Sequence, residues 1–129
     1  MIFIPEIFMS LGFLLILIIS VFLKKNSHII VGYLSLILIF LTQFFVLKDI
    51  FLFEEIFNSF FVIDSFGSFL KSIILISAGL VIYFYLIVKN EISLQRPEFL
   101  LITLIAIIGM MLMVSSNDLL SLFVSLELQ

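Results

Sequence analysis

The sequence predicts an all-α integral membrane protein with four transmembrane helices and the first half of a fifth. Of its 129 residues, 64% are hydrophobic and 12% are charged, a composition that an ordinary soluble domain does not have. The charges lie between apolar stretches that are close to the roughly 17–25 residues a transmembrane helix needs. We expect a single membrane domain over residues 1–129, with helices at about 6–23, 28–47, 70–88, 98–115 and 118–129.

The expected helices are joined in pairs by two short basic connections. The first apolar stretch begins after Glu6, with no basic segment before it and no small-residue cleavage site after it, so we expect it to be kept as a span. Lys24 and Lys25 divide it from the second stretch, and Lys89 and Arg96 divide the third helix from the fourth. By the positive-inside rule, both connections face the cytoplasm or the mitochondrial matrix, and the N-terminus lies outside.

The connection between the second and third helices, residues 48–71, is long, aromatic and acidic, and we expect it on the outer side. Its phenylalanines favour an interfacial or strand-like segment, with rings against lipid headgroups and neighbouring protein and with acids such as Glu54 and Glu55 toward water. Asp64, which precedes a Ser-Phe-Gly step, is typical of a turn. Lys71 is expected to be an interfacial anchor at the head of the third helix.

Small residues mark expected places of close packing in the third and fourth helices. Ser77–Gly79 is either a packing notch or a flexible point in the third helix, and Thr103, Ala106 and Gly109 recur every third residue along the fourth. The methionines that follow Gly109 are expected to be adaptable core filler. Packing is the favoured interpretation of all these features.

Glu127 is the candidate functional residue, because it lies deep inside an apolar helix. The polar run Ser115–Asp118 predicts a turn at the membrane surface, with Asn117 or Asp118 capping the helix that follows. At about 1.5 Å per residue, Glu127 lies roughly 13–14 Å along that helix. The hydrocarbon layer is about 30 Å thick, so the carboxylate is expected close to its middle.

Two interpretations of Glu127 compete. A protonated acid that a hydroxyl or an amide satisfies would be a packing element, whereas a proton or ion relay would be functional. We favour the relay, because intramembrane carboxylates are rare and mostly serve transport. At about 100° per residue, Ser121 and Ser125 share one stripe of the helix, and Glu127 projects to the opposite side with Leu120 and Phe123. No lysine of this chain is expected at the same depth.

Several classes of site are excluded by composition. The chain has no cysteine, which removes disulfides, thiolate metal sites, iron–sulfur ligation and thiol nucleophiles. His28 is the single histidine, so a histidine-based metal site is excluded as well. The net charge of −3 and the lack of a basic block argue against nucleic acid as a partner. We therefore expect no cofactor and no metal.

The segment Gly109–Gln129, GMMLMVSSNDLLSLFVSLELQ, resembles a segment of the antiporter-like membrane subunits of respiratory complex I, NADH–ubiquinone oxidoreductase. Within that family it is most similar to subunit 2, which is chain N in bacterial naming. Three further features agree with the resemblance: the Pro5-Glu6 pair, the segment Phe61–Phe66 and Glu98 at the entry to the fourth helix. The last stretch is the specific part of the match, while the rest of the chain matches in hydropathy.

The resemblance implies a subunit of the proton-pumping arm that contributes to proton translocation, carries no redox cofactor and performs no redox catalysis itself. The enzyme it implies for the whole complex is a proton-translocating NADH:ubiquinone reductase. Glu127 matches the family's glutamate in the fifth helix, which is thought to pair with a lysine two helices further on. The implied partners are a chain carrying the rest of subunit 2, neighbouring membrane subunits and lipid. The implied location is the mitochondrial inner membrane, with the bacterial plasma membrane as the alternative.

The chain stops where a family member would continue, and this suggests the N-terminal piece of a divided subunit. A helix from Asp118 to Gln129 covers only about half of the bilayer, so we expect another polypeptide to continue the bundle at Gln129 and to supply the lysine partner of Glu127. Two alternatives stay open: a small multidrug-type proton-coupled exporter, and a purely structural accessory subunit. The exporter would pump alone, and the accessory subunit would tolerate Glu127→Ala.

Overall fold

The computed structural model describes residues 4–23, 27–49, 54–56, 61–63, 65–88, 97–116 and 119–129. These residues form five helices and two short strands, and four of the helices are long and apolar enough to cross a membrane. The prediction of four long apolar helices followed by a short fifth is confirmed. The elements are α1 (Ile4–Phe22), α2 (Ser27–Asp49), β1 (Glu54–Ile56), β2 (Phe61–Ile63), α3 (Ser65–Ile87), α4 (Pro97–Ser115) and α5 (Leu119–Leu128).

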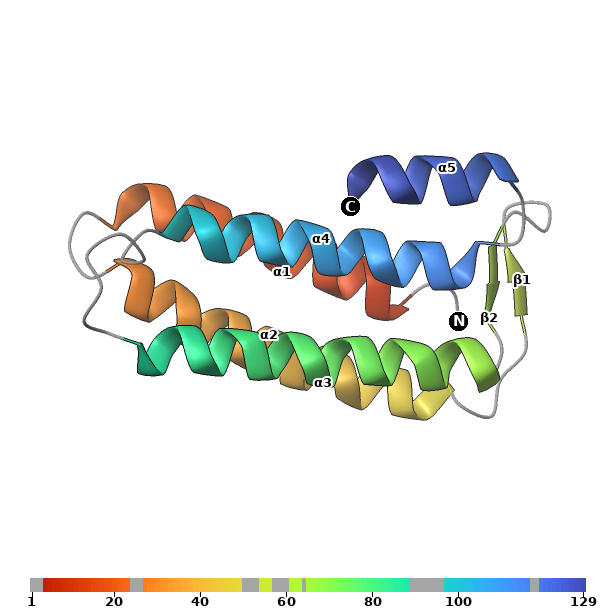
Figure 1. The fold of residues 1–129 in the computed structure, drawn as a ribbon, viewed down its shortest axis with the longest axis horizontal. Coiled ribbons are helices and arrows are strands. Elements are labelled where there is room, and N and C mark those ends of the chain that lie inside the picture. Colours follow the sequence, from red (N-terminus) through yellow and green to blue (C-terminus); the bar gives the residue numbers. More distant parts are fainter. Residues whose placement is uncertain are drawn as a thin grey trace.

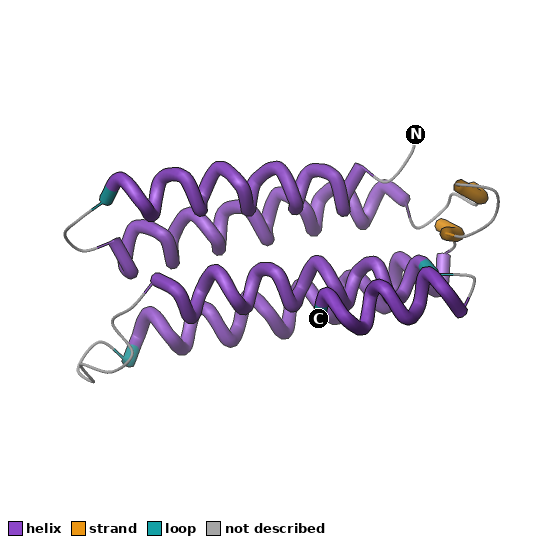
Figure 2. Tube along the Cα trace, turned by 90° about the horizontal axis from the view of Figure 1, so that it is seen from above, coloured by secondary structure: helices purple, strands orange, loops and turns teal. Residues whose placement is uncertain are grey.

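The four long helices pack side by side as a bundle (Figures 1 and 2). Helix α1 contacts α2 and α4, and α3 contacts the same two helices, so each long helix has at least two neighbours. Helix α5 runs back along α4. The start of α1, the strand pair and the start of α5 all lie at one end of the bundle (Figure 1).

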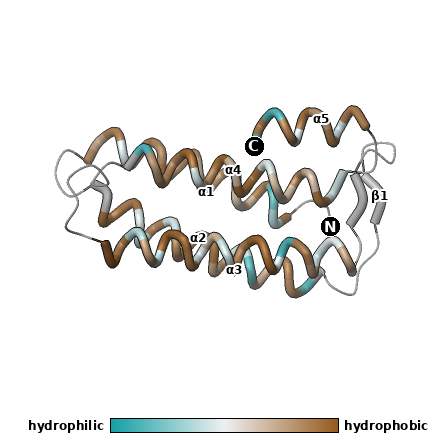
Figure 3. Tube along the Cα trace, viewed as in Figure 1, coloured by the Kyte–Doolittle hydropathy of each residue, from teal (hydrophilic) through white to brown (hydrophobic). Residues whose placement is uncertain are grey.

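Apolar side chains fill the interior and also cover the outside of the bundle. Figure 3 shows that most residues along the four long helices are hydrophobic. Met9, Val31, Leu75, Leu104 and Met111 are fully buried where the helices meet. Many leucines, isoleucines and phenylalanines on the opposite faces are exposed. A helix that is apolar on all sides suits a lipid environment. Its inner face packs against neighbouring helices, and its outer face contacts lipid tails that are equally apolar.

The connection between α2 and α3 contains a two-stranded antiparallel hairpin. Glu54 faces Ile63 in the pairing register, Glu55 faces Val62, and Ile56 faces Phe61. The strand-like interpretation of this segment is therefore confirmed for its two paired stretches. Other residues used in the sequence argument lie outside the described ranges, namely Lys24, Lys25, Asp64, Lys89, Arg96, Asn117 and Asp118.

Helix α3 begins earlier than the sequence suggested. It starts at Ser65 and not near residue 70, because the Ser-Phe-Gly-Ser step forms the first helical turn. The helix then continues through Lys71, which lies six residues, or about 9 Å, inside it. A residue expected at the head of the helix is thus carried into the bundle.

The small residues of α3 and α4 face several different neighbours, and Gly79 lies toward Ile39 of α2. Ser77 and Ala78 from α3 line one shallow groove together with Thr103 and Ala106 from α4. Gly109 serves a different contact, because it lies directly against the backbone of Gln129 at the end of α5. The small residues of α4 therefore face two different partners within the chain.

Candidate functional site

A charged pair is buried between three helices at the hairpin end of the bundle. Glu6 belongs to the first turn of α1, and Lys71 comes from the inner face of α3. The side chains of Lys71 and Glu6 are only 4% and 3% exposed, and their Nζ and Oε1 atoms form a salt bridge. From the last residue of α4, Ser115 Oγ donates a hydrogen bond of 3.1 Å to the same carboxylate oxygen.

The helical phase explains why these polar groups meet. On α3, Lys71 shares one stripe with Leu75, Ala78 and Ile82, all of which are buried. On α1, Glu6 shares the inward face with Met9 in the same way. Packing of the apolar stripes therefore brings the ammonium and the carboxylate together.

The two carboxylate oxygens of Glu6 differ in their hydrogen bonds. Both donors, the Lys71 ammonium and the Ser115 hydroxyl, bind Oε1. The second oxygen, Oε2, is buried and has no hydrogen-bond partner within the described part of the chain. An ionised carboxylate accepts hydrogen bonds on both oxygens, so half of its accepting capacity is unused here.

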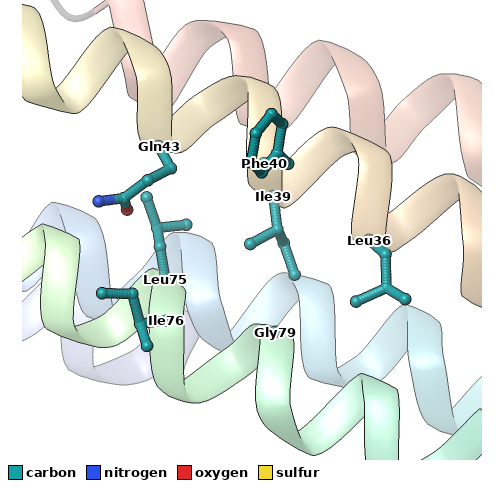
Figure 4. A pocket seen from close by; sticks show the side chains of 7 residues that line it. All are labelled: Leu36, Ile39, Phe40, Gln43, Leu75, Ile76 and Gly79. Carbon is teal, nitrogen blue, oxygen red and sulfur yellow. The ribbon is translucent and has the colours of Figure 1, made fainter.

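Further polar side chains of α2 and α3 lie near this end of the bundle. Gln43 Nε2 donates a hydrogen bond of 2.6 Å to Ser72 Oγ, next to Lys71 in sequence. The amide oxygen of Gln43 is buried without a partner among the described residues. Figure 4 shows Gln43 at one end of a mostly apolar groove between α2 and α3. Thr42 contacts Met9 Sδ at 3.6 Å, one turn along α1 from Glu6.

The expectation for Lys71 was wrong. It is not an interfacial anchor but a core residue, and Glu6 is not simply the boundary of the first span. The alignment of Lys71 with Leu75 and Ile82 on one stripe of α3 was a signal that Lys71 faces inward, although it did not identify Glu6 as the partner. A charged residue near a helix end does not always mark the boundary of a span, and Glu6 and Lys71 both lie inside the packed bundle.

Glu127 lies on the face of α5 that points away from the bundle. Ser121 and Ser125 are buried, whereas Glu127 is exposed together with Leu120 and Phe123. The predicted division of this helix into two faces is confirmed. Glu127 lies eight residues, or about 12 Å, beyond Leu119, the first residue of α5. Within the described residues it has no ion-pair partner.

Metal binding finds no support in the described ranges, where no group of three or more histidine, cysteine, aspartate or glutamate side chains could hold an ion. Fold and site together define a multi-pass membrane protein. It has a buried acid–base pair, Glu6 and Lys71, and a further acid, Glu127, on the exposed face of α5. Intramembrane ionisable groups of this kind belong to transport proteins more than to any other class.

Sequence comparison identifies the relatives of this chain. It is 34% identical to NADH-quinone oxidoreductase subunit N of Parvibaculum lavamentivorans, and 35% identical to subunit N of Bartonella bacilliformis, in each case over 97% of its length. Subunit N of Paramagnetospirillum magneticum is 34% identical over the same share. No protein-family model matches. The chain spans 26% of the length of these relatives and is homologous to the N-terminal part of subunit N.

Proposed function

We propose that the chain is a membrane-arm segment of a proton-pumping NADH:quinone oxidoreductase and contributes to proton translocation coupled to electron transfer. The observation that carries this proposal is the homology to subunit N over 97% of the chain. The electron-transfer chemistry belongs to other subunits, because four apolar spans without a cysteine offer no ligands for an iron–sulfur cluster.

Glu127 is the proposed proton-binding residue of the chain. Its helix holds it about 12 Å from Leu119, inside the depth of a bilayer. Its neighbours on the exposed face, Leu120 and Phe123, are apolar, so this face suits contact with another helix. A lysine from that helix would stabilise the ionised acid, and its withdrawal would favour proton uptake.

The proposed partners are the remaining helices of a subunit-N-like bundle and the adjoining membrane subunits. The relatives named above are about four times as long as this chain, and helices beyond the matched part would cover the exposed face of α5. We propose the mitochondrial inner membrane as the location of the chain, with the bacterial plasma membrane as the alternative. The bacterial origin of the relatives named above favours the alternative.

Native electrophoresis of gently solubilised membranes tests the assignment. An epitope-tagged chain should migrate with the large assembly that reduces a dye with NADH in the gel. Migration as a small oligomer without NADH-dependent staining would favour the exporter instead. Co-migration with unimpaired pumping after Glu127→Ala would favour the structural accessory subunit.

The proposed orientation predicts where single cysteines can be labelled. Because the chain has no native cysteine, Asn26→Cys and Asn90→Cys each introduce one unique thiol. Both positions lie in the short basic connections, so they should react with an impermeant thiol reagent in inverted vesicles and stay unreactive in right-side-out vesicles. Labelling from the outer face would overturn the topology.

A further inference from the structure

We propose that Glu6 and Lys71 form a second proton-exchange site of this chain, with Ser115 holding the oxygen that receives the proton. This inference rests on the proposed function, because it takes proton translocation as the context. The second site uses other residues than the proposed function does. Glu6, Lys71 and Ser115 lie between α1, α3 and α4, whereas Glu127 lies on α5. Among the described residues, Glu6 and Lys71 are the charged side chains buried in the bundle.

The geometry provides a path for one proton. In the ion pair, Lys71 Nζ donates directly to Glu6 Oε1. Transfer breaks one N–H bond of the ammonium and forms one O–H bond on the carboxylate, which leaves a neutral amine and a neutral acid. Uptake of a proton by the amine and loss of a proton from the acid restore the charged pair. One cycle therefore moves one proton through the site, with no change in net charge at the transfer step.

Two opposing effects act on the charges of the buried pair. Desolvation acts against each charge, and the attraction between the two charges offsets that cost. A buried ion pair is most stable when further hydrogen bonds satisfy its remaining lone pairs. Here Oε2 has no such bond within the described part of the chain, so the ionised carboxylate is incompletely stabilised.

The pair and Glu127 lie at similar depths along the bundle but on separate faces, because Glu127 points away from the bundle. Lys71 lies about 9 Å inside α3, and Glu127 lies about 12 Å along α5, both counted from the hairpin end. Ser115 ends α4, the helix along which α5 returns. Ser115, the hydrogen-bond donor to Glu6, therefore belongs to the helix on which α5 packs.

The alternative is a purely structural ion pair that fixes three helices together. The two roles differ in their tolerance of arginine, because a guanidinium keeps its charge and hydrogen bonds but does not release a proton in a protein. A structural pair would accept Lys71→Arg, whereas a proton-exchange pair would not. The double variant Glu6→Gln/Lys71→Met also distinguishes the two roles. It removes both charges and both proton-exchanging groups but keeps similar side-chain volumes.

The experiment places Lys71→Arg and the double variant in the chain within its assembled complex, in inverted membrane vesicles. Two quantities are measured: the amount of assembled complex and the protons pumped per NADH oxidised. We expect assembly close to that of the unmodified protein in at least one of the two variants, together with a several-fold lower proton-to-NADH ratio. An unchanged ratio in either assembled variant would overturn the inference. Failure of both to assemble would also count against it, because the pair would then be indispensable structurally.

An infrared measurement keeps this inference distinguishable from the proposed function. Exchange in the pair requires that Glu6 become protonated, so membranes should show a carboxylic-acid band that shifts in heavy water and is missing from Glu6→Gln. That readout does not depend on pumping. If the band is present while Glu127→Gln pumps normally, the Glu127 assignment fails and the exchange site stands. If Glu127→Gln loses pumping and no such band exists, the exchange site fails alone.

Discussion

Replacing Lys71 by alanine should destabilise the helix bundle by about 3–5 kcal/mol, the range typical of breaking a buried ion pair. The carboxylate of Glu6 would stay buried at the junction of α1, α3 and α4 without its counter-charge. Heating membranes and measuring the fraction of the chain that remains soluble in mild detergent would reveal a lower midpoint temperature. The steady-state amount of the chain should fall with it.

Lys48→Ala is the matched control for this substitution. Lys48 is an exposed lysine whose Nζ lies 4.6 Å from the ring centre of Phe44, a contact worth about 0.5–1 kcal/mol at an exposed site. The double variant Glu6→Gln/Lys71→Met should recover most of the lost stability, because no unpaired charge remains buried. Equal midpoints for Lys71→Ala and Lys48→Ala would contradict the buried pair.

Adding a methyl group at Gly109 should loosen the contact between α4 and α5. A Cβ atom there would lie 2.8 Å from the backbone nitrogen of Gln129 and 3.0 Å from its Cα. Backbone atoms cannot rotate away as a side chain can, so α5 would have to shift. We expect Gly109→Ala to destabilise the chain by about 1–3 kcal/mol, the usual cost of overpacking. The same heating assay measures it.

Gly79→Ala offers the comparison for that variant. Its added Cβ would meet Ile39 Cγ2 at 3.8 Å, which is an ordinary van der Waals contact. Alanine also favours a helix over glycine, so this substitution should be neutral or slightly stabilising. A larger loss of stability at Gly79 than at Gly109 would show that α5 does not pack on α4 as the structure has it.

Hydropathy was sufficient to find the spans, because each long helix must present about 20 apolar residues to lipid whatever its neighbours are. It also identified the two faces of α5, since the fixed rotation of about 100° per residue separates Ser121 and Ser125 from Glu127. These features are local to one helix, and the sequence of that helix determines them.

The buried pair could not be read in the same way, because it depends on which helices meet. Glu6 is 65 positions from Lys71 and 109 positions from Ser115. A charge two residues into a helix can lie at a membrane surface or between helices, and hydropathy does not distinguish the two. The phase of Lys71 relative to Leu75 and Ile82 carried the missing information. This phase indicates that Lys71 lies on the inner face of α3, but it does not identify Glu6 as the partner of Lys71.

The ratio of protons pumped to NADH oxidised in vesicles carrying Glu127→Gln tests the central claim most directly. The amide keeps the shape and hydrogen bonding of the acid but does not bind and release a proton, so we predict normal assembly with a clearly lowered ratio. Glu98→Gln, an exposed acid in the first turn of α4, is the control and should leave the ratio unchanged. A fully assembled Glu127→Gln complex that pumps at the unmodified ratio would contradict the role of Glu127 in the proton path.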